Sequence, residues 1–153
     1  MVPGTKESPR ECRSRAGSMG LHHLDLVVSS IERSLPFYRG LLGPLGWHGI
    51  GEVEGERGET IWYLSGRETS IGLREAQSES GPYDRYAVGL HHLAIEAPSR
   101  AVVNERAAWL RMNGATIESE PQEYTYLPGY YAVFFYDPDG MKLEILHVPA
   151  LAA

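Results

Sequence analysis

Four of the six histidines in this 153-residue chain lie in two copies of one pentapeptide, Gly-Leu-His-His-Leu. The copies span residues 20–24 and 89–93. Imidazole nitrogen is a common ligand for divalent metals such as zinc, iron and nickel. Because each copy carries the same pair, the repeat predicts a metal site that takes one histidine from each half of the chain.

Side-chain alternation along a strand indicates which histidine of each pair does the chemistry. In the first copy, His22 shares a face with aliphatic residues, whereas His23 shares the opposite face with Asp25. We expect the apolar row to pack on a helix and the mixed row to face a cavity. The second copy follows the same rule, with His91 on the apolar row and His92 beside Ala94 and Glu96. His23 and His92 are therefore the predicted ligands, and the outer histidines are expected to be structural or surface residues.

Glu144 is the carboxylate that completes this predicted site. A strand is predicted over residues 141–147, after the turn-forming sequence Asp-Pro-Asp-Gly at 137–140. Alternation places Glu144 and Lys142 on the mixed row of this strand. Two imidazoles and one carboxylate leave positions on a metal open for water and substrate. The simpler readings are hydrogen-bonded core histidines and a solvated strand acid, but the repeat and the shared parity favour ligands.

The elements around the two pentapeptides repeat as well. Each copy begins a unit that reads strand, helix and three strands. The halves cover residues 20–76 and 89–148, and a linker at 77–88 joins them. The predicted strands are 21–28, 47–53, 59–65 and 69–76 in the first half and 90–97, 115–120, 130–136 and 141–147 in the second.

One helix is predicted in each half. In the first half, Ser29 is the predicted N-cap, with Ser34 as an alternative because Pro36 removes a backbone donor and could delay the start. In the second half, Ser99 is predicted to cap a helix that ends near Asn113.

Composition and charge narrow the classes of function. A formal charge of −6 and a pI near 5.5 disfavour nucleic acid and anionic membrane surfaces as partners. No apolar run approaches the ~20 residues of a membrane-spanning helix. The single cysteine, Cys12, cannot form an internal disulfide and fits a reducing cytoplasm. The polar segment 1–19 is predicted to be a flexible tail, which leaves residues 20–148 as a single domain, predicted to be cytoplasmic.

The chain resembles the vicinal oxygen chelate superfamily, which includes glyoxalase I, methylmalonyl-CoA epimerase, extradiol dioxygenases, and fosfomycin- and bleomycin-resistance proteins. The resemblance covers about residues 20–148. It rests on HHLDLVV with SLPFYRGLLG in the first half, and on HHLAIEA with YYAVFFYDPDGMKLEIL in the second. It implies an α+β fold in which two βαβββ modules form a cupped mixed β-sheet with helices outside. It also implies a homodimer, and a divalent metal held by His23, His92 and Glu144.

Many members of this superfamily add a fourth ligand on the last strand of the first half. Aligning Leu64 with Tyr136 places Gly72 opposite Glu144, and glycine offers no ligand atom. We therefore expect three protein ligands. Residues expected to line the cavity are Asp25, Gly72, Glu96, Tyr131 and Lys142.

Two functions are open at this point. In the first, a divalent metal, which could be Fe, Zn, Ni, Co or Mn, acts as a Lewis acid on a small substrate bound through two oxygens. The chemistry would be that of a lyase, an isomerase or, with Fe(II) and O₂, a ring-cleaving dioxygenase. In the second, the chain is a metal-free binding protein that sequesters a drug or another small molecule, as the bleomycin-resistance proteins do. The sequence contains no P-loop, GxSxG, CxxC or dinucleotide-binding motif.

Overall fold

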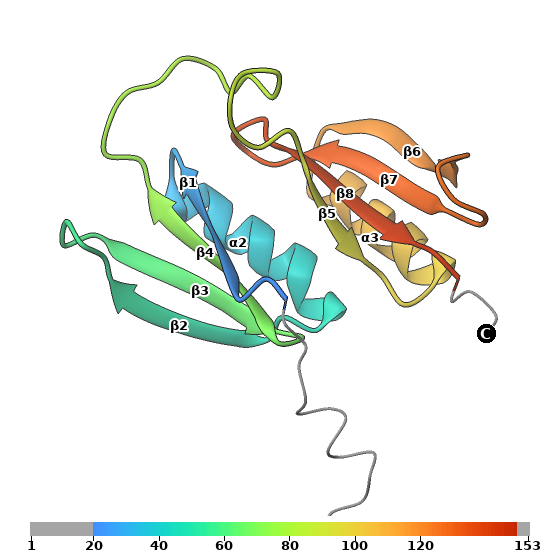
Figure 1. Ribbon diagram of the computed structural model, residues 1–153, viewed down its shortest axis with the longest axis horizontal. Helices are drawn as coiled ribbons and strands as arrows, with labels where there is room; N and C mark the ends of the chain where they lie inside the picture. Colours follow the sequence, from blue (N-terminus) through green and yellow to red (C-terminus); the bar gives the residue numbers. More distant parts are fainter. Residues whose placement is uncertain (1–19, 150–153) are drawn as a thin grey trace, which may run out of the picture.

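The computed structural model describes residues 20–149, so the predicted tail at 1–19 lies outside the described residues (Figure 1). The first module comprises β1 (His23–Val28), α2 (Ile31–Leu42), the 3₁₀ turn η1 (Gly43–Leu45), β2 (Gly49–Glu54), β3 (Thr60–Gly66) and β4 (Thr69–Glu75). The second comprises β5 (Leu93–Glu96), α3 (Arg100–Met112), β6 (Ile117–Glu123), β7 (Tyr131–Tyr136) and β8 (Lys142–His147). The predicted order of elements is confirmed in both halves.

Each module contributes one four-stranded mixed sheet. The strand orders are β1-β4-β3-β2 and β5-β8-β7-β6. The first strand of each module runs parallel to the last, and the other neighbours are antiparallel. The fold is therefore α+β, built from two βαβββ modules, as the sequence predicts. β1 and β5 each pair with one strand only, so each is the edge of its sheet.

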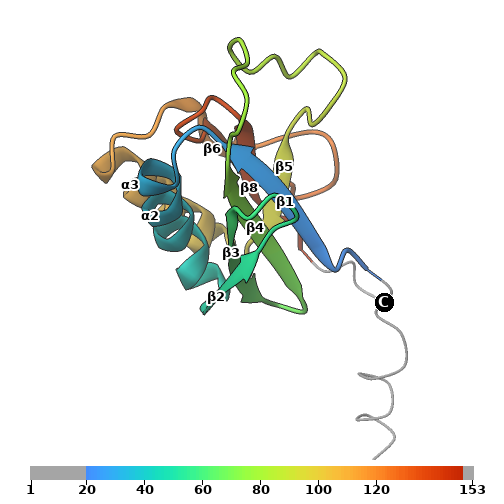
Figure 2. The same cartoon turned by 90° about the vertical axis from the view of Figure 1, so that its left-hand side faces the viewer.

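Both helices lie together on one side of the two sheets (Figure 2). The apolar rows predicted from alternation face them: Leu26 and Val28 of β1 are buried, as are Ile95 of β5 and Ile145 of β8. These residues belong to one continuous core that includes residues of both modules. Burial of that shared core holds the two modules together, because apolar burial is the main favourable term in folding. Within residues 20–149, neither helix is long and apolar enough to cross a membrane.

The start of helix α2 differs from the prediction by one residue. Ser30 is the N-cap, and its side chain accepts a hydrogen bond from the backbone N–H of Arg33. Ser29, the predicted cap, instead donates its backbone N–H to Asp139 Oδ2 in the second module, at 2.9 Å. Pro36 lies inside the helix without delaying its start, and Ser34 is buried in the first turns. Ser99 caps helix α3 as predicted.

The Asp-Pro-Asp-Gly turn ties the second module to the first. The carboxylate of Asp137 is buried and accepts a 2.8 Å hydrogen bond from the hydroxyl of Tyr38 on helix α2. It also accepts the backbone N–H groups of Asp139 and Met141, which closes the turn. Burial raises the pKa of Tyr38 well above its ordinary value, so its hydroxyl keeps the proton that it donates. The turn therefore has a structural role between modules.

Helices α2 and α3 are in close contact at Gly40. A Cβ atom added there would lie 2.3 Å from the indole carbon Cζ2 of Trp109 on helix α3. Beside this contact, the buried guanidinium of Arg106 donates a 3.0 Å hydrogen bond to the Gly40 carbonyl. Glycine is unfavourable inside a helix, so its place here follows from the space that the Trp109 ring occupies.

Gly40→Ala is expected to lower the free energy of unfolding by about 1–2 kcal/mol, because the added methyl overpacks the interface between the helices. The measurement is urea denaturation followed by far-UV circular dichroism. The matched control is Gly43→Ala just after the same helix, where an added Cβ meets nothing within 4 Å. Equal stability of the two variants would contradict the close-packing argument.

Candidate functional site

The helix-free face of the second sheet carries His92 and Glu144. Nε2 of His92 lies 3.5 Å from Oε2 of Glu144, which is the separation of two groups that can meet on one ion. The Glu144 side chain is only 2% exposed. Ala94 and Phe134 are the residues paired with Glu144 on the neighbouring strands, and alternation brings His92 onto the same face.

Tyr130 fixes the other oxygen of this carboxylate. Its hydroxyl lies 2.5 Å from Oε1 of Glu144 and donates to it. Burial raises the pKa of Tyr130, and the hydrogen bond to Glu144 raises it further. The phenol therefore stays protonated, which leaves Oε2 of Glu144 directed at His92.

The charge of Glu144 has little compensation inside the protein. Among residues 20–149, His92 is the only basic side chain that pairs with this carboxylate. A buried carboxylate without a cationic partner is costly, and the cost is relieved by a cation or by protonation. The donor set of one imidazole and one carboxylate is chemically suited to a divalent metal.

A cavity of about 560 Å³ opens in front of this pair. One wall is aromatic, because the rings of Tyr124 and Tyr126 stack 5.5 Å apart and Phe134 meets Tyr124 edge-on at 5.2 Å. Ser119 and Gln122 add polar groups beside this wall, where each hydrogen-bonds to the hydroxyl of Tyr124. A planar or aromatic molecule could lie against this wall while its polar atoms face the His92–Glu144 pair.

Glu118 organises the charged rim of the same cavity. Its carboxylate is 2.5 Å from Nζ of Lys142 and 3.1 Å from Nη1 of Arg85, and it accepts a 2.5 Å hydrogen bond from the Tyr136 hydroxyl. Lys142 and the other two donors lower the pKa of Glu118 to about 2. Lys142 thus lines the cavity as predicted, but its charge is already paired. Arg85 was not predicted: it comes from the linker, where the sequence offers no periodic pattern.

The helix-free face of the first sheet carries His23, whose ring packs edge-on against Tyr63 at 5.8 Å. Next to it, Arg74 donates 2.6 Å and 2.8 Å hydrogen bonds to Asp25 and Glu59. The Tyr63 hydroxyl reaches the same oxygen of Asp25 at 3.3 Å. On this face one guanidinium is shared by two carboxylates, whereas no Arg or Lys among residues 20–149 pairs with Glu144 on the other face.

Gly72 occupies the position that corresponds to Glu144. It pairs with Asp25 on one side and Tyr63 on the other, as Glu144 pairs with Ala94 and Phe134. The predicted equivalence is confirmed, although the neighbouring strand aligns Leu64 with Phe135, not with Tyr136.

The space beside Gly72 is filled by its neighbours. A Cβ added at Gly72 would lie 2.3 Å from Oδ1 of Asp25 and 2.7 Å from the Tyr63 ring. That Asp25 oxygen is buried and has no hydrogen-bond donor among residues 20–149. The Asp25 carboxylate therefore lies where a side chain at Gly72 would begin.

His23 does not join His92 and Glu144 within one chain. It lies on the other sheet, and it is not among the residues that line the cavity in front of Glu144. Across residues 20–149, no group of three or more His, Cys, Asp or Glu side chains is placed to hold a metal ion. The chain thus presents two partial sites, one per module, and the assignment of all three residues to one metal stays a prediction.

Of the five expected cavity residues, only Lys142 lines the cavity in front of Glu144. Asp25 and Gly72 lie on the first sheet, and Tyr131 and Glu96 lie elsewhere. Tyr131 is on the helix-facing row of β7, where its hydroxyl donates to Oδ1 of Asn104 at 2.8 Å. The cavity residue is its neighbour Tyr130, and pairing of Tyr131 with His147 on the apolar row explains the difference. Glu96 is exposed at the rim of a second cleft, where Arg67 donates to its backbone carbonyl.

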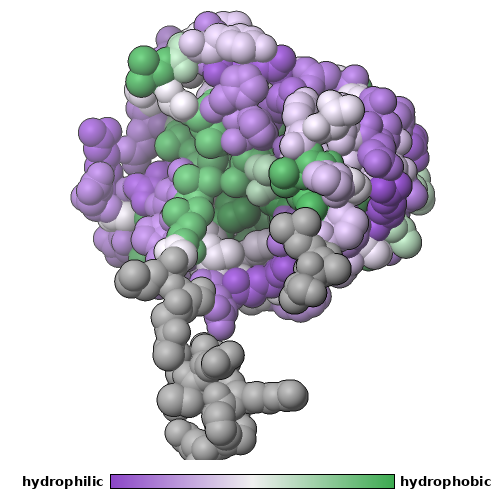
Figure 3. All heavy atoms as spheres, turned by 45° about the vertical axis from the view of Figure 1, so that its right-hand side comes forward, coloured by the Kyte–Doolittle hydropathy of each residue, from purple (hydrophilic) through white to green (hydrophobic). Residues whose placement is uncertain are grey.

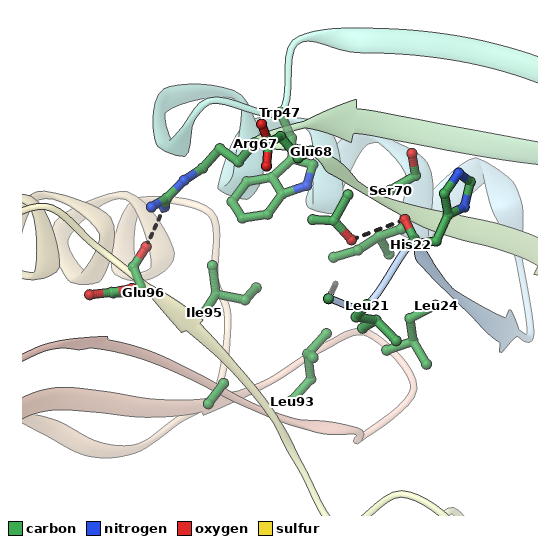
Figure 4. A pocket seen from close by; sticks show the side chains of 14 residues that line it. Leu21, His22, Leu24, Trp47, Arg67, Glu68, Ser70, Leu93, Ile95 and Glu96 are labelled. Atoms are coloured by element: carbon green, nitrogen blue, oxygen red, sulfur yellow. Dashed lines mark hydrogen bonds between the residues drawn. The ribbon is translucent and has the colours of Figure 1, made fainter. Parts of the chain in front are cut away.

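That second cleft lies between the edge strands β1 and β5 and has a volume of about 630 Å³ (Figures 3 and 4). Its walls are mainly apolar, with Leu24, Trp47, Leu93 and Ile95 around the opening. Figure 3 shows the hollow as a hydrophobic area framed by hydrophilic surface. The cleft has no convergent set of histidines and carboxylates, so it is not the candidate metal site.

The double histidines adopt the same arrangement in both modules. The Nδ1 atoms of His22 and His23 lie 2.8 Å apart, and those of His91 and His92 also lie 2.8 Å apart. In each pair the rings meet edge-on, with centroids 5.1 Å and 5.0 Å apart. Desolvation and the neighbouring His92 lower the pKa of His91, which favours its neutral form.

Comparison with known proteins identifies the family. Two uncharacterized proteins of Bacillus subtilis (strain 168) are similar in sequence: YqjT is 29% identical over 127 residues, and YwkD is 32% identical over 130 residues. Each alignment covers 82% of this chain, and 97% and 94% of the respective relative. The crystal structure of a glyoxylase/bleomycin resistance protein/dioxygenase domain from Frankia sp. EAN1pec has the same fold, with a TM-score of 0.71 and 24% identity, over 86% of this chain and 98% of that one. The sequence model of one family matches residues 20–145, so the chain belongs to the Glyoxalase/Bleomycin resistance protein/Dioxygenase superfamily.

Proposed function

We propose that this protein binds a divalent metal through His23, His92 and Glu144, and that the metal holds a small oxygenated substrate through two of its oxygens. The reaction is of the lyase, isomerase or ring-cleaving dioxygenase type. The observation that carries the proposal is the His92–Glu144 pair, with Nε2 and Oε2 3.5 Å apart at an open cavity. Among residues 20–149, neither Arg nor Lys pairs with this buried carboxylate, so a bound cation would relieve the cost of burying its charge.

The donor set supports a metal in preference to an organic cation. Imidazole and carboxylate are ligands of the intermediate metals Zn, Fe, Co, Ni and Mn. When bound, such a metal supplies Lewis-acid polarisation of the substrate oxygens. Tyr130 would hold Glu144 in a fixed orientation. A carboxylate that is already ordered loses less conformational entropy when it binds a metal.

The remaining groups of the cavity would select and orient the substrate. The aromatic wall of Tyr124, Tyr126 and Phe134 offers stacking contacts for a planar group. Gln122 and Ser119, next to Tyr124, can donate and accept hydrogen bonds. The ion pair of Glu118 with Lys142 is self-compensated, so it would shape the cavity without attracting a charged substrate strongly.

The third ligand, His23, is proposed to come from a second copy of the chain in a homodimer. His23 is exposed on a sheet face that does not contain the His92–Glu144 pair. The edge strands β1 and β5 are unpaired on one side, and the apolar cleft lies between them. Leu21 beside it is 64% exposed. Exposed apolar surface and free strand edges are features that association between copies covers.

A cytoplasmic location for the protein is also part of this proposal.

The alternative function is a metal-free binding protein. It is favoured by the tyrosine wall, which could hold a flat or cationic drug by stacking. In that case Glu144 would pair with the ligand's own positive charge. The two functions differ in whether a metal is needed for ligand binding, which the following experiment measures.

Wild-type protein purified without chelator is expected to bind one Co²⁺ or Zn²⁺ per complete site in a calorimetric titration. His92→Ala and Glu144→Gln should each weaken this binding by more than about 100-fold. Substitution of a residue that only hydrogen-bonds to a metal ligand typically costs about 10- to 100-fold. His48→Ala removes an exposed histidine distant from the cavity and is the control. Equal affinity of wild type and both site variants would leave the metal-free alternative as the better description.

Mixing two variants tests whether the site is shared between subunits. His23→Ala and Glu144→Gln homodimers each lack one ligand in every site. If each site combines one module from each subunit, a mixed dimer regains one intact site, so about a quarter of the wild-type number of tight sites should appear after subunit exchange. No recovery in a sample shown by native mass spectrometry to contain mixed dimers would contradict a shared site.

A further inference from the structure

The outer histidines, His22 and His91, each contact the inner histidine of their pair through a ring nitrogen, which a surface residue without a role would not need to do. Each places Nδ1 at 2.8 Å from Nδ1 of the inner histidine, His23 or His92. This distance is that of a hydrogen bond between nitrogens. The same contact appears in two modules that differ elsewhere on these faces, so it follows from the His-His sequence itself at the start of the strand.

A hydrogen bond between two neutral imidazoles fixes the location of one proton. Only one of the two Nδ1 atoms can carry hydrogen, and the other must accept. When Nδ1 of His92 carries the proton, its Nε2 has a free lone pair. That Nε2 is the atom 3.5 Å from Glu144 Oε2. The opposite assignment would put hydrogen on Nε2 and block it as a ligand.

We infer that His22 and His91 are positioning residues that accept the Nδ1 proton of His23 and His92 when Nε2 of the inner ring binds a metal. This inference rests on the proposed function. The hydrogen bond orients the inner ring, stabilises the tautomer with a free Nε2 in the metal-bound state and makes that Nε2 a better donor. The duplicated double histidine is then explained: one member of each pair is the ligand and the other accepts its Nδ1 proton.

The second partner of His92 explains why a histidine suits the outer position. Without metal, the carboxylate of Glu144 attracts a proton on Nε2 of His92, so Nδ1 of His92 accepts and His91 must donate. With metal, His92 donates and His91 must accept. A neutral histidine can do either by changing tautomer, and a glutamine amide offers both a donor and an acceptor. A leucine offers neither.

The test compares His91→Leu, His91→Gln and wild type in two measurements. The first is calorimetric titration with Zn²⁺. The second is ¹⁵N-edited NMR of the histidine rings, which reports which nitrogen of His92 carries hydrogen in the metal-free and Zn²⁺-loaded protein. His48→Leu is the control for removing an exposed imidazole, and circular dichroism confirms that each variant is folded.

His91→Leu is expected to bind Zn²⁺ about 10- to 100-fold more weakly, with His91→Gln recovering most of the loss. In wild type, Zn²⁺ should move the His92 ring to the form with hydrogen on Nδ1. Unchanged affinity in His91→Leu, or a loss that His91→Gln does not recover, would overturn the positioning role. If wild type itself binds Zn²⁺ no better than His92→Ala, the proposed function fails first and this inference fails with it.

Discussion

In both sheets, a strand that packs one row of side chains on a helix must turn the alternate row away from the core. The core therefore determines the site. Leu26 and Val28 are buried against the helices, and this requires His23 to face the opposite side. Ile95 and Ile145 are buried in the same way, which turns His92, just before β5, and Glu144, on the adjacent parallel strand β8, to the opposite side. A shift of one residue in either strand would bury a ligand and expose the core, so the position of the site is as strongly specified as the fold.

This constraint explains how much of the molecule was predictable from its sequence. The βαβββ order, the faces of β1, β5 and β8, and the equivalence of Gly72 with Glu144 follow from alternation and from the repeat. The start of helix α2 was missed because Ser29 and Ser30 can both cap it. The choice depends on Asp139, which is 110 residues away and holds Ser29. Tyr131 was assigned to the cavity although its parity with the apolar row argued against that assignment. Tyr130, one residue before the strand, has the parity of Phe134, which lines the cavity. Arg85 reaches the rim of the cavity from an irregular linker, where no periodic pattern in the sequence indicated its position.

The two modules have kept their fold while their exposed faces have become different. At equivalent positions, one face has Glu144 and the other has Gly72, and the space at Gly72 is taken by the Asp25 carboxylate. Asp25 is in turn held by Arg74, which Glu59 also binds. The first face therefore holds two carboxylates on one guanidinium and also carries one exposed imidazole, that of His23. The second face keeps a buried carboxylate with a single basic neighbour. In the proposed three-ligand site, this asymmetry would give the modules unequal parts, with two ligands from one module and one from the other.

The packing of the two helices limits how the face that carries His23 and the face that carries Glu144 can come together. Gly40 allows helix α2 to approach Trp109 on helix α3, and Tyr38 anchors the Asp-Pro-Asp-Gly turn that leads into the strand of Glu144. These contacts hold the modules of one chain together through their helix-covered sides. A rigid core at that interface resists the rearrangement that would bring His23 to Glu144 within the chain. The helix-free faces remain available to another copy, and the unpaired edges of β1 and β5 provide backbone groups at the place where two copies would adjoin. A shared site is thus the arrangement that uses both faces without disturbing the core.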